Sequence, residues 1–106
     1  MTAVGDQGDT KAARRAARVV VGNYHEAQLA ELIEHVREAL VRYDAGEIDV
    51  FELDDLIHHY QRSARELWKF CAGTGSHVLF AARTLEYWQA EGDLPDWWEA
   101  GTPKRR

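Results

Sequence analysis

The sequence has one cysteine, two prolines and no long apolar run. Cys71 cannot form an internal disulfide, and no second cysteine or close histidine stands at zinc-site spacing from it, so we expect a small buried side chain there. No stretch approaches the roughly 18 apolar residues of a transmembrane helix, and the N-terminus lacks the order of a signal peptide. We therefore expect a cytoplasmic protein without a membrane partner.

Sequence signatures of enzymes are also missing. The chain has no Gly-rich phosphate loop ending in Lys-Ser or Lys-Thr, no His-Glu-x-x-His and no Gly-x-Ser-x-Gly. Residues 46–52 resemble the second half of an EF-hand loop, but the earlier ligand places fall on side chains that cannot bind calcium, namely Val41, Tyr43 and Ala45. We expect no catalytic residue and no cofactor.

The best local group of metal-ligand types is Asp55 with His58 and His59. A metal site in a helical bundle needs inward ligands from several helices. At 100° per residue both histidines lie beside or opposite the apolar side of their own helix, and an exposed pair from Asp55 to His59 explains the same residues. We expect no metal.

Charge is distributed unevenly along a chain of net charge -5. Between Val19 and Gly101 there are 6 Lys or Arg against 16 Asp or Glu, whereas both ends are basic. The basic residues of the ends are Lys11, Arg14, Arg15, Arg18, Lys104, Arg105 and Arg106. The acidic body would repel a phosphate backbone, so contact with nucleic acid would have to come from the ends or a local patch.

Local signals predict a helix over 10–21, interrupted at Gly22-Asn23, and longer helices over 24–44, 50–72 and 77–91. Asn23 to Glu26, Asp49 to Glu52 and Asp96 to Glu99 have capping-box spacing, and Ser76 stands at an N-cap position. Gly46 and Gly92 are typical C-terminal stops. Apolar residues at steps of four and three predict the buried stripes, which are Leu29, Ile33, Val36, Leu40 and Tyr43, then Leu53, Ile57, Tyr60, Ala64, Leu67 and Cys71.

These patterns predict an all-α fold. Because links of about four residues force neighbouring helices to run antiparallel, we expect a small up-down-up three-helix bundle with a short basic N-terminal helix or arm and a Trp-containing C-terminal turn. The expected organisation is a flexible leader and basic arm over 1–21, a bundle domain over 22–100 and a basic tail over 101–106.

Two basic features allow two interpretations each. His58, Arg62, Arg65 and Lys69 form a ridge opposite the buried side of the second long helix. The ridge is either a solvated face neutralised by nearby acids or a site for a carboxylate- or phosphate-bearing partner. The segment with Lys11, Arg14, Arg15 and Arg18 is either a frayed soluble helix or an arm that orders on nucleic acid or an acidic protein. It lacks an aromatic residue for base stacking.

Aromatic residues of the third helix predict a second covered surface. Phe80 and Tyr87 point almost opposite to Val78, Ala82 and Leu85, with Trp88 in between. Either residues 95–99 fold back and lay Trp97 or Trp98 across these rings, or the rings meet a partner or a second copy of the chain.

We therefore expect a non-enzymatic protein interaction module, acting as a regulator, an antitoxin-like inhibitor or an assembly adaptor, with a homodimer among the expected forms. The candidate partner-binding residues are Phe80, Tyr87, Trp88, Trp97, Trp98, His58, Arg62, Arg65 and Lys69. The alternative is a nucleic-acid-binding protein that uses the basic N-terminal arm and the ridge, with Lys11, Arg14, Arg15 and Arg18 as contacts.

Overall fold

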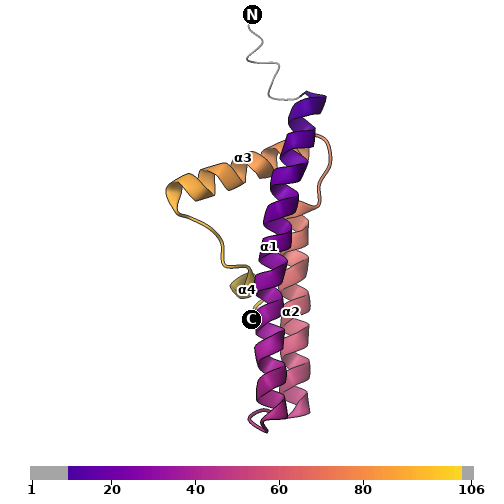
Figure 1. Cartoon of the computed structure of the whole chain (residues 1–106), viewed down its shortest axis with the longest axis vertical. Helices are drawn as coiled ribbons and strands as arrows, with labels where there is room; N and C mark the ends of the chain where they lie inside the picture. The colour runs from indigo at the N-terminus through magenta and orange to yellow at the C-terminus, as the bar shows by residue number, and fades with distance from the viewer. Residues whose placement is uncertain (1–9, 104–106) are drawn as a thin grey trace, which may run out of the picture.

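The computed structural model describes residues 10–103, and Figure 1 shows an elongated arrangement of helices. They are α1 (Lys11–Asp44), α2 (Val50–Cys71), α3 (Ser76–Glu91) and α4 (Trp97–Ala100). No strand occurs between residues 10 and 103, so the predicted all-α class is confirmed. The Cα radius of gyration is 17.8 Å, whereas a compact domain of this length has about 13 Å. Within this range no helix has the length and apolar character of a membrane span.

An antiparallel hairpin of α1 and α2 forms the long axis of the molecule (Figure 1). Gly46, with φ of 78°, follows the end of α1 as predicted. The Asp49 side chain accepts a hydrogen bond from the Glu52 backbone N–H at 2.8 Å, and the Glu52 side chain accepts one from the Asp49 N–H at 2.9 Å. This predicted capping box closes the start of α2 and fixes the turn.

The predicted interruption at Gly22-Asn23 is wrong, because α1 continues through both residues. The basic segment is thus the beginning of a 34-residue helix, capped by the Thr10 hydroxyl, which accepts a hydrogen bond from the Ala13 N–H. A glycine inside a helix costs about 1 kcal/mol, and burial of Ala17 and Val21 in the core offsets that cost. The predicted boundary between residues 21 and 22 lies within α1.

The buried side of α1 is displaced from the predicted stripe. Leu32 and Ala39 are 3% and 2% exposed, whereas Ile33 and Leu40, their neighbours in the chain, are 38% and 44% exposed. In α2 the prediction is closer, since Leu53, Leu67 and Cys71 are buried. The small side chain of Ala39 lets α1 and α2 approach closely at that point. Because α2 packs on this side of α1, the larger side chains of Ile33 and Leu40 lie at the edge of the helix pair.

The third helix does not complete an up-down-up bundle. Figure 1 shows α3 running sideways across α1, and α3 packs chiefly against α1. The link from Ala72 to Gly75 turns sharply, and Gly75 adopts the positive φ of 58° as the N-cap. The predicted N-cap Ser76 is instead the first residue of the helix. A short link limits how far the chain travels but not the angle at which the next helix leaves.

The main core lies where α3 crosses the hairpin. It contains residues of three helices, namely Ala17, Val21, Leu32, Leu67, Cys71, Val78, Leu79, Ala81 and Leu85. Gly92, with φ of 69°, ends α3 as predicted, and the chain then returns to α2 through the four-residue helix α4. The Asp96 side chain accepts a hydrogen bond from the Glu99 N–H, so the predicted cap at this turn is formed.

Candidate interaction surfaces

Trp98 lies between two histidine rings. Its ring stacks on His35 of α1 at a centroid distance of 3.9 Å and on His59 of α2 at 3.7 Å. The Trp98 carbonyl oxygen lies 2.8 Å from His59 Nε2 and accepts a hydrogen bond from the buried Ser63 hydroxyl at 3.0 Å. These contacts fasten α4 to the middle of the hairpin. His59 therefore faces the interior of the fold, and the expected exposed pair with Asp55 is wrong.

The two other candidate tryptophans lie in a second aromatic cluster. Trp97 Nε1–H donates a hydrogen bond to the Tyr24 hydroxyl, with 2.6 Å between the heavy atoms. Phe70 packs against both Trp97 and Trp88, with ring centroids 5.9 and 4.9 Å apart. Burial raises the pKa of the Tyr24 hydroxyl, against the opposite effect of the Trp97 hydrogen bond. Trp88, Trp97 and Trp98 thus stabilise the fold by contacts within the chain.

Phe80 and Tyr87 are not covered by the C-terminal segment. They are 63% and 61% exposed, whereas Trp97 and Trp98 are held against α1 and α2. The expectation that residues 95–99 fold back over these rings is therefore wrong. The alternative that a partner covers them stays a prediction.

The basic ridge on α2 is exposed, but three of its four side chains have neighbours. His58 Nδ1 lies 3.5 Å from Asp54, and the Lys69 ammonium lies 3.0 Å from Glu66. Arg62 Nε–H donates to the Gly101 carbonyl oxygen at 2.8 Å. A surface cavity of about 430 Å³ lies between the ridge and residues 100–103. His58, Arg62 and Lys69 therefore already interact with groups of the same chain.

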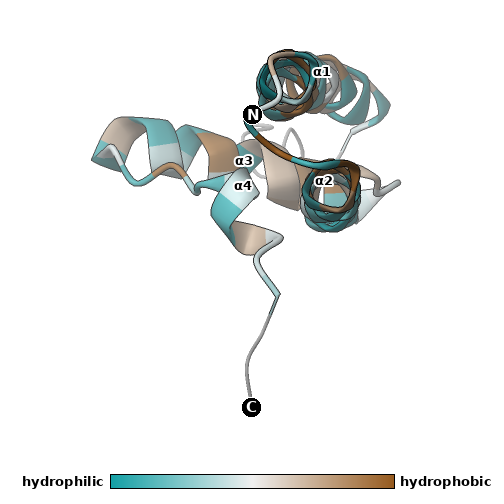
Figure 2. Cartoon of the chain, turned by 90° about the horizontal axis from the view of Figure 1, so that it is seen from below, coloured by the Kyte–Doolittle hydropathy of each residue, from teal (hydrophilic) through white to brown (hydrophobic). Residues whose placement is uncertain are grey.

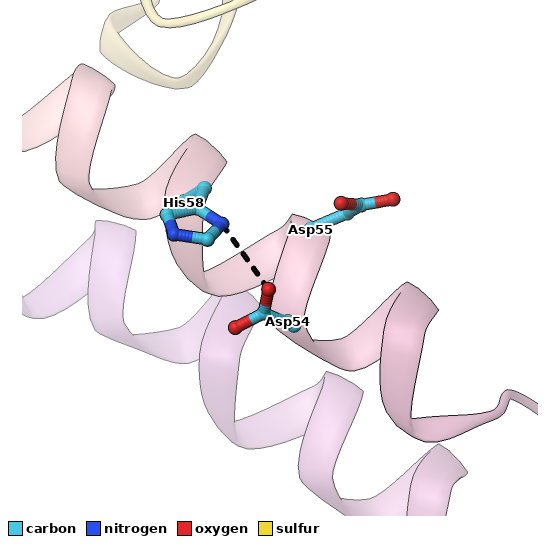
Figure 3. Close-up of side chains that lie close together, drawn as sticks. All are labelled: Asp54, Asp55 and His58. Atoms are coloured by element: carbon cyan, nitrogen blue, oxygen red, sulfur yellow. Dashed lines mark ion pairs between the residues drawn. The ribbon is translucent and has the colours of Figure 1, made fainter.

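The close approach of Asp54, Asp55 and His58 does not amount to a metal centre. Their ligand atoms lie within 4.8 Å of one another, and all three side chains are exposed. Figure 3 shows that all three project from α2 and that only Asp54 and His58 are joined by an ion pair. One exposed helix surface gives none of the enclosure from several helices that bundle metal sites use.

The basic residues near the start of the described chain lie on the first two turns of α1. Lys11, Arg15 and Arg18 are exposed and follow one side of the helix at steps of four and three, while Arg14 is half-buried. They belong to a helix that is anchored in the core by Ala17 and Val21. The residues of the predicted leader and of the C-terminal tail at 1–9 and 104–106 lie outside the described range.

Cys71 is buried in the main core, and burial raises the pKa of its thiol to about 11. Because the thiolate is the reactive form, a rise of the pKa from its ordinary value of 9.0 to about 11 lowers the thiolate fraction near neutral pH by roughly 100-fold. We expect the native protein to react with a disulfide reagent at least that much more slowly than the protein unfolded in urea. Equal rates in the two states, measured by stopped-flow absorbance, would contradict this assignment.

A further apolar surface lies on the long hairpin, where the sequence analysis had predicted buried residues. Figure 2 looks along the hairpin and shows α3 and α4 on the same side of the α1–α2 pair. The side they leave open carries five large apolar side chains that are 38–58% exposed. We call this surface the hairpin face; its exposed members are Ile33, Leu40, Tyr43, Val50 and Trp68, and its half-buried members are Leu29, Val36, Ile57 and Ala64.

Helical geometry explains why these residues share one face. On α1, Ile33 and Leu40 lie about 100° from the neighbouring buried positions, on the side away from His35, which contacts α4. On α2, Val50, Ile57, Ala64 and Trp68 recur at steps of seven, seven and four, on the side away from His59. The α1 part of this face is the apolar stripe from Leu29 to Tyr43, which the sequence analysis predicted to be buried.

Comparisons with known proteins give no family assignment: no family model, no curated protein and no solved structure matches the chain.

Proposed function

We propose that the protein is an interaction module that docks on another protein surface through the hairpin face. The observation that carries the proposal is the set of large apolar side chains on the side of the hairpin that α3 and α4 leave open. Monomeric soluble proteins rarely expose a contiguous apolar surface along two helices, and such surfaces mark interaction sites. Regulators, antitoxin-like inhibitors and assembly adaptors all act through surfaces of this kind.

Phe80 and Tyr87 extend this proposal to a second, smaller surface. Both rings are exposed on the outer side of α3, where neighbouring residues are polar. Two isolated aromatic rings bury less area than the hairpin face, so they serve as a secondary contact. The ridge residues Arg62 and Lys69 bind an acidic partner only after exchanging their present contacts with Gly101 and Glu66 for contacts with that partner.

Nucleic acid is the second candidate partner, favoured by the exposed alignment of Lys11, Arg15 and Arg18 on α1. Several phosphate contacts would make binding fall steeply between about 50 and about 200 mM salt, whereas docking of an apolar face is nearly insensitive to salt. The absence of a neighbouring exposed aromatic ring on the first turns of α1, and the acidic body beside them, make this candidate the weaker one.

A photoreactive phenylalanine analogue at position 40 tests the protein-docking proposal in cells of the natural host. We expect irradiation to link position 40 covalently to protein, because the exposed side chain there lies within the docking surface. The matched control carries the analogue at position 27, an exposed alanine on the opposite side of α1. Equal crosslinking at positions 40 and 27, or none at position 40, overturns the proposal.

A further inference from the structure

We infer that the partner on the hairpin face is a second copy of this chain, with α1 packed antiparallel on α1 and α2 on α2 in a four-helix bundle. This inference rests on the proposed docking function and names its partner. Three observations carry it: the spacing of the apolar residues, the distribution of charge along the hairpin and the size of the open face.

The spacing on α1 is that of a helix which packs against another helix on this side. Leu29, Ile33, Val36, Leu40 and Tyr43 recur at steps of four and three, as core positions of coiled coils do. Within the chain α2 packs on Leu32 and Ala39 instead. The exposed members of the repeat, Ile33, Leu40 and Tyr43, are therefore left for a helix of another molecule.

The same repeat is complementary to itself. In an antiparallel pair centred on Val36, Leu29 of one copy lies level with Tyr43 of the other, and Ile33 lies within one residue of the level of Leu40. A large residue thus opposes a large residue on each side of the centre, and no charged residue is among the five. An interface between identical copies needs this kind of match about its two-fold axis.

Charge along the hairpin separates into two ends. Residues 44–55, at the turn, contain six Asp or Glu and no Lys or Arg. Toward the other end, residues 62–69 contain three Lys or Arg and one Glu, and residues 11–18 contain four Lys or Arg and no acid. Each copy therefore presents an acidic tip, a basic segment on α2 and a basic segment at the start of α1.

Antiparallel packing brings these opposite charges together. Tyr24 contacts Phe70, and His35 lies level with His59 across Trp98, so Val36 on α1 is level with His58 on α2. A two-fold axis at this level carries residues 50–54 of one copy onto residues 62–66 of the other. The acidic tip then lies beside Arg65 at the edge of the face, whereas a parallel arrangement would place two acidic tips side by side.

The open face has the dimensions of a dimer interface. From residue 26 to residue 44 it extends about 27 Å along α1 at 1.5 Å per residue, and two packed helices make it about 20 Å wide. The flat area of such a strip is roughly 500 Å². Because side chains project from the helices, its accessible area is larger and approaches the roughly 800 Å² that each partner buries in a standard interface.

Light scattering of the purified full chain measures the self-association. We expect a mass of about 24 kDa, twice the chain mass of 12.1 kDa, at concentrations up to about 100 μM. Leu40→Glu places a charge within the face, and we expect it to halve the mass with an unchanged helical circular dichroism spectrum. Ala27→Glu adds the same charge on the opposite side of α1 and keeps the dimer.

A helical wild-type monomer at every concentration overturns the second copy as the partner. If such a monomer is still crosslinked to another protein at position 40, the docking proposal stands and only the identity of the partner fails. A dimer that Leu40→Glu leaves intact also overturns the inference, because the copies then meet elsewhere.

The orientation is tested by Val36→Cys in a Cys71→Ala background, treated with a short thiol-to-thiol crosslinker. We expect a covalent dimer, because the two Val36 positions lie across the two-fold axis on helices about 8 to 10 Å apart. Leu29→Cys in the same background is the control, since its two copies would lie about 21 Å apart along the helix axis. Failure of position 36 to crosslink in a chain that is dimeric by light scattering overturns the antiparallel arrangement.

Discussion

Deletion of residues 1–21 is expected to lower the free energy of unfolding by about 3 kcal/mol or more and to release α3 from the hairpin. Ala17 and Val21 are 5% and 3% exposed and pack in the cluster that holds Val78, Leu79 and Leu85. Burial of a valine side chain contributes about 1.5 to 3 kcal/mol. The deletion also exposes the apolar side of α3, because α3 packs chiefly against α1.

Urea denaturation and limited proteolysis within residues 76–91 measure the two effects. Deletion of residues 1–9 alone is the control, because it keeps the Thr10 cap and every core contact of α1. A point substitution refines the comparison: Val21→Ala should cost about 2 kcal/mol, whereas Val19→Ala, at a position 59% exposed, should cost little. If the truncated chain unfolds at the same urea concentration with α3 still protected, the first turns of α1 are a dispensable arm after all.

Helix ends could be predicted from the sequence because short-range chemistry decides them. Asp49 and Glu52 form both hydrogen bonds of their capping box, and the positive φ angles of Gly46 and Gly92 fall at the predicted stops. In each case the interacting groups lie within one helical turn of each other. Such signals keep their meaning whatever the rest of the chain does.

Longer-range features could not be predicted because packing overrides local preference. Gly22 and Asn23 look like a helix break, yet α1 passes through them where the residues on either side contact the core. Two overlapping apolar stripes on α1 were both compatible with helical spacing, and the approach of α2 to small Ala39 selects the one through Leu32. The direction of α3 depends on the Gly75 turn and on side chains that meet only in the folded chain.

The candidate site residues divide in the same way. Exposure of the ridge on α2 follows from its helical positions and was predictable, as was the direction of Phe80 and Tyr87 away from Val78 and Leu85. The contacts that Trp97 and Trp98 make within the chain were not predictable, since they join positions 27 to 73 residues apart. Composition favours tryptophan at interfaces, but it does not distinguish an interface between molecules from one between segments of a chain.

Substitution of Trp98, whose ring contacts both α1 and α2, should also lower the free energy of unfolding by a large amount. For Trp98→Ala we expect a loss of about 3 kcal/mol, at the low end of the range for buried aromatic residues because Trp98 is half-buried. The change removes the ring between His35 and His59. Phe80→Ala is the matched control, because it removes an aromatic ring that is 63% exposed.

The four residues of α4 are too few to form a stable helix alone, so side-chain contacts must hold the segment in place. Gly101 lies so close to α2 that an added Cβ would collide with Ser63, and this fit depends on Trp98 being seated. We therefore expect Trp98→Ala also to make residues 92–103 sensitive to protease while α1 and α2 keep their helical signal. Trp98→Phe, which keeps a ring between the two histidines, should restore part of both properties. Equal loss in Trp98→Ala and Phe80→Ala would show that the stacked histidines contribute nothing to holding α4.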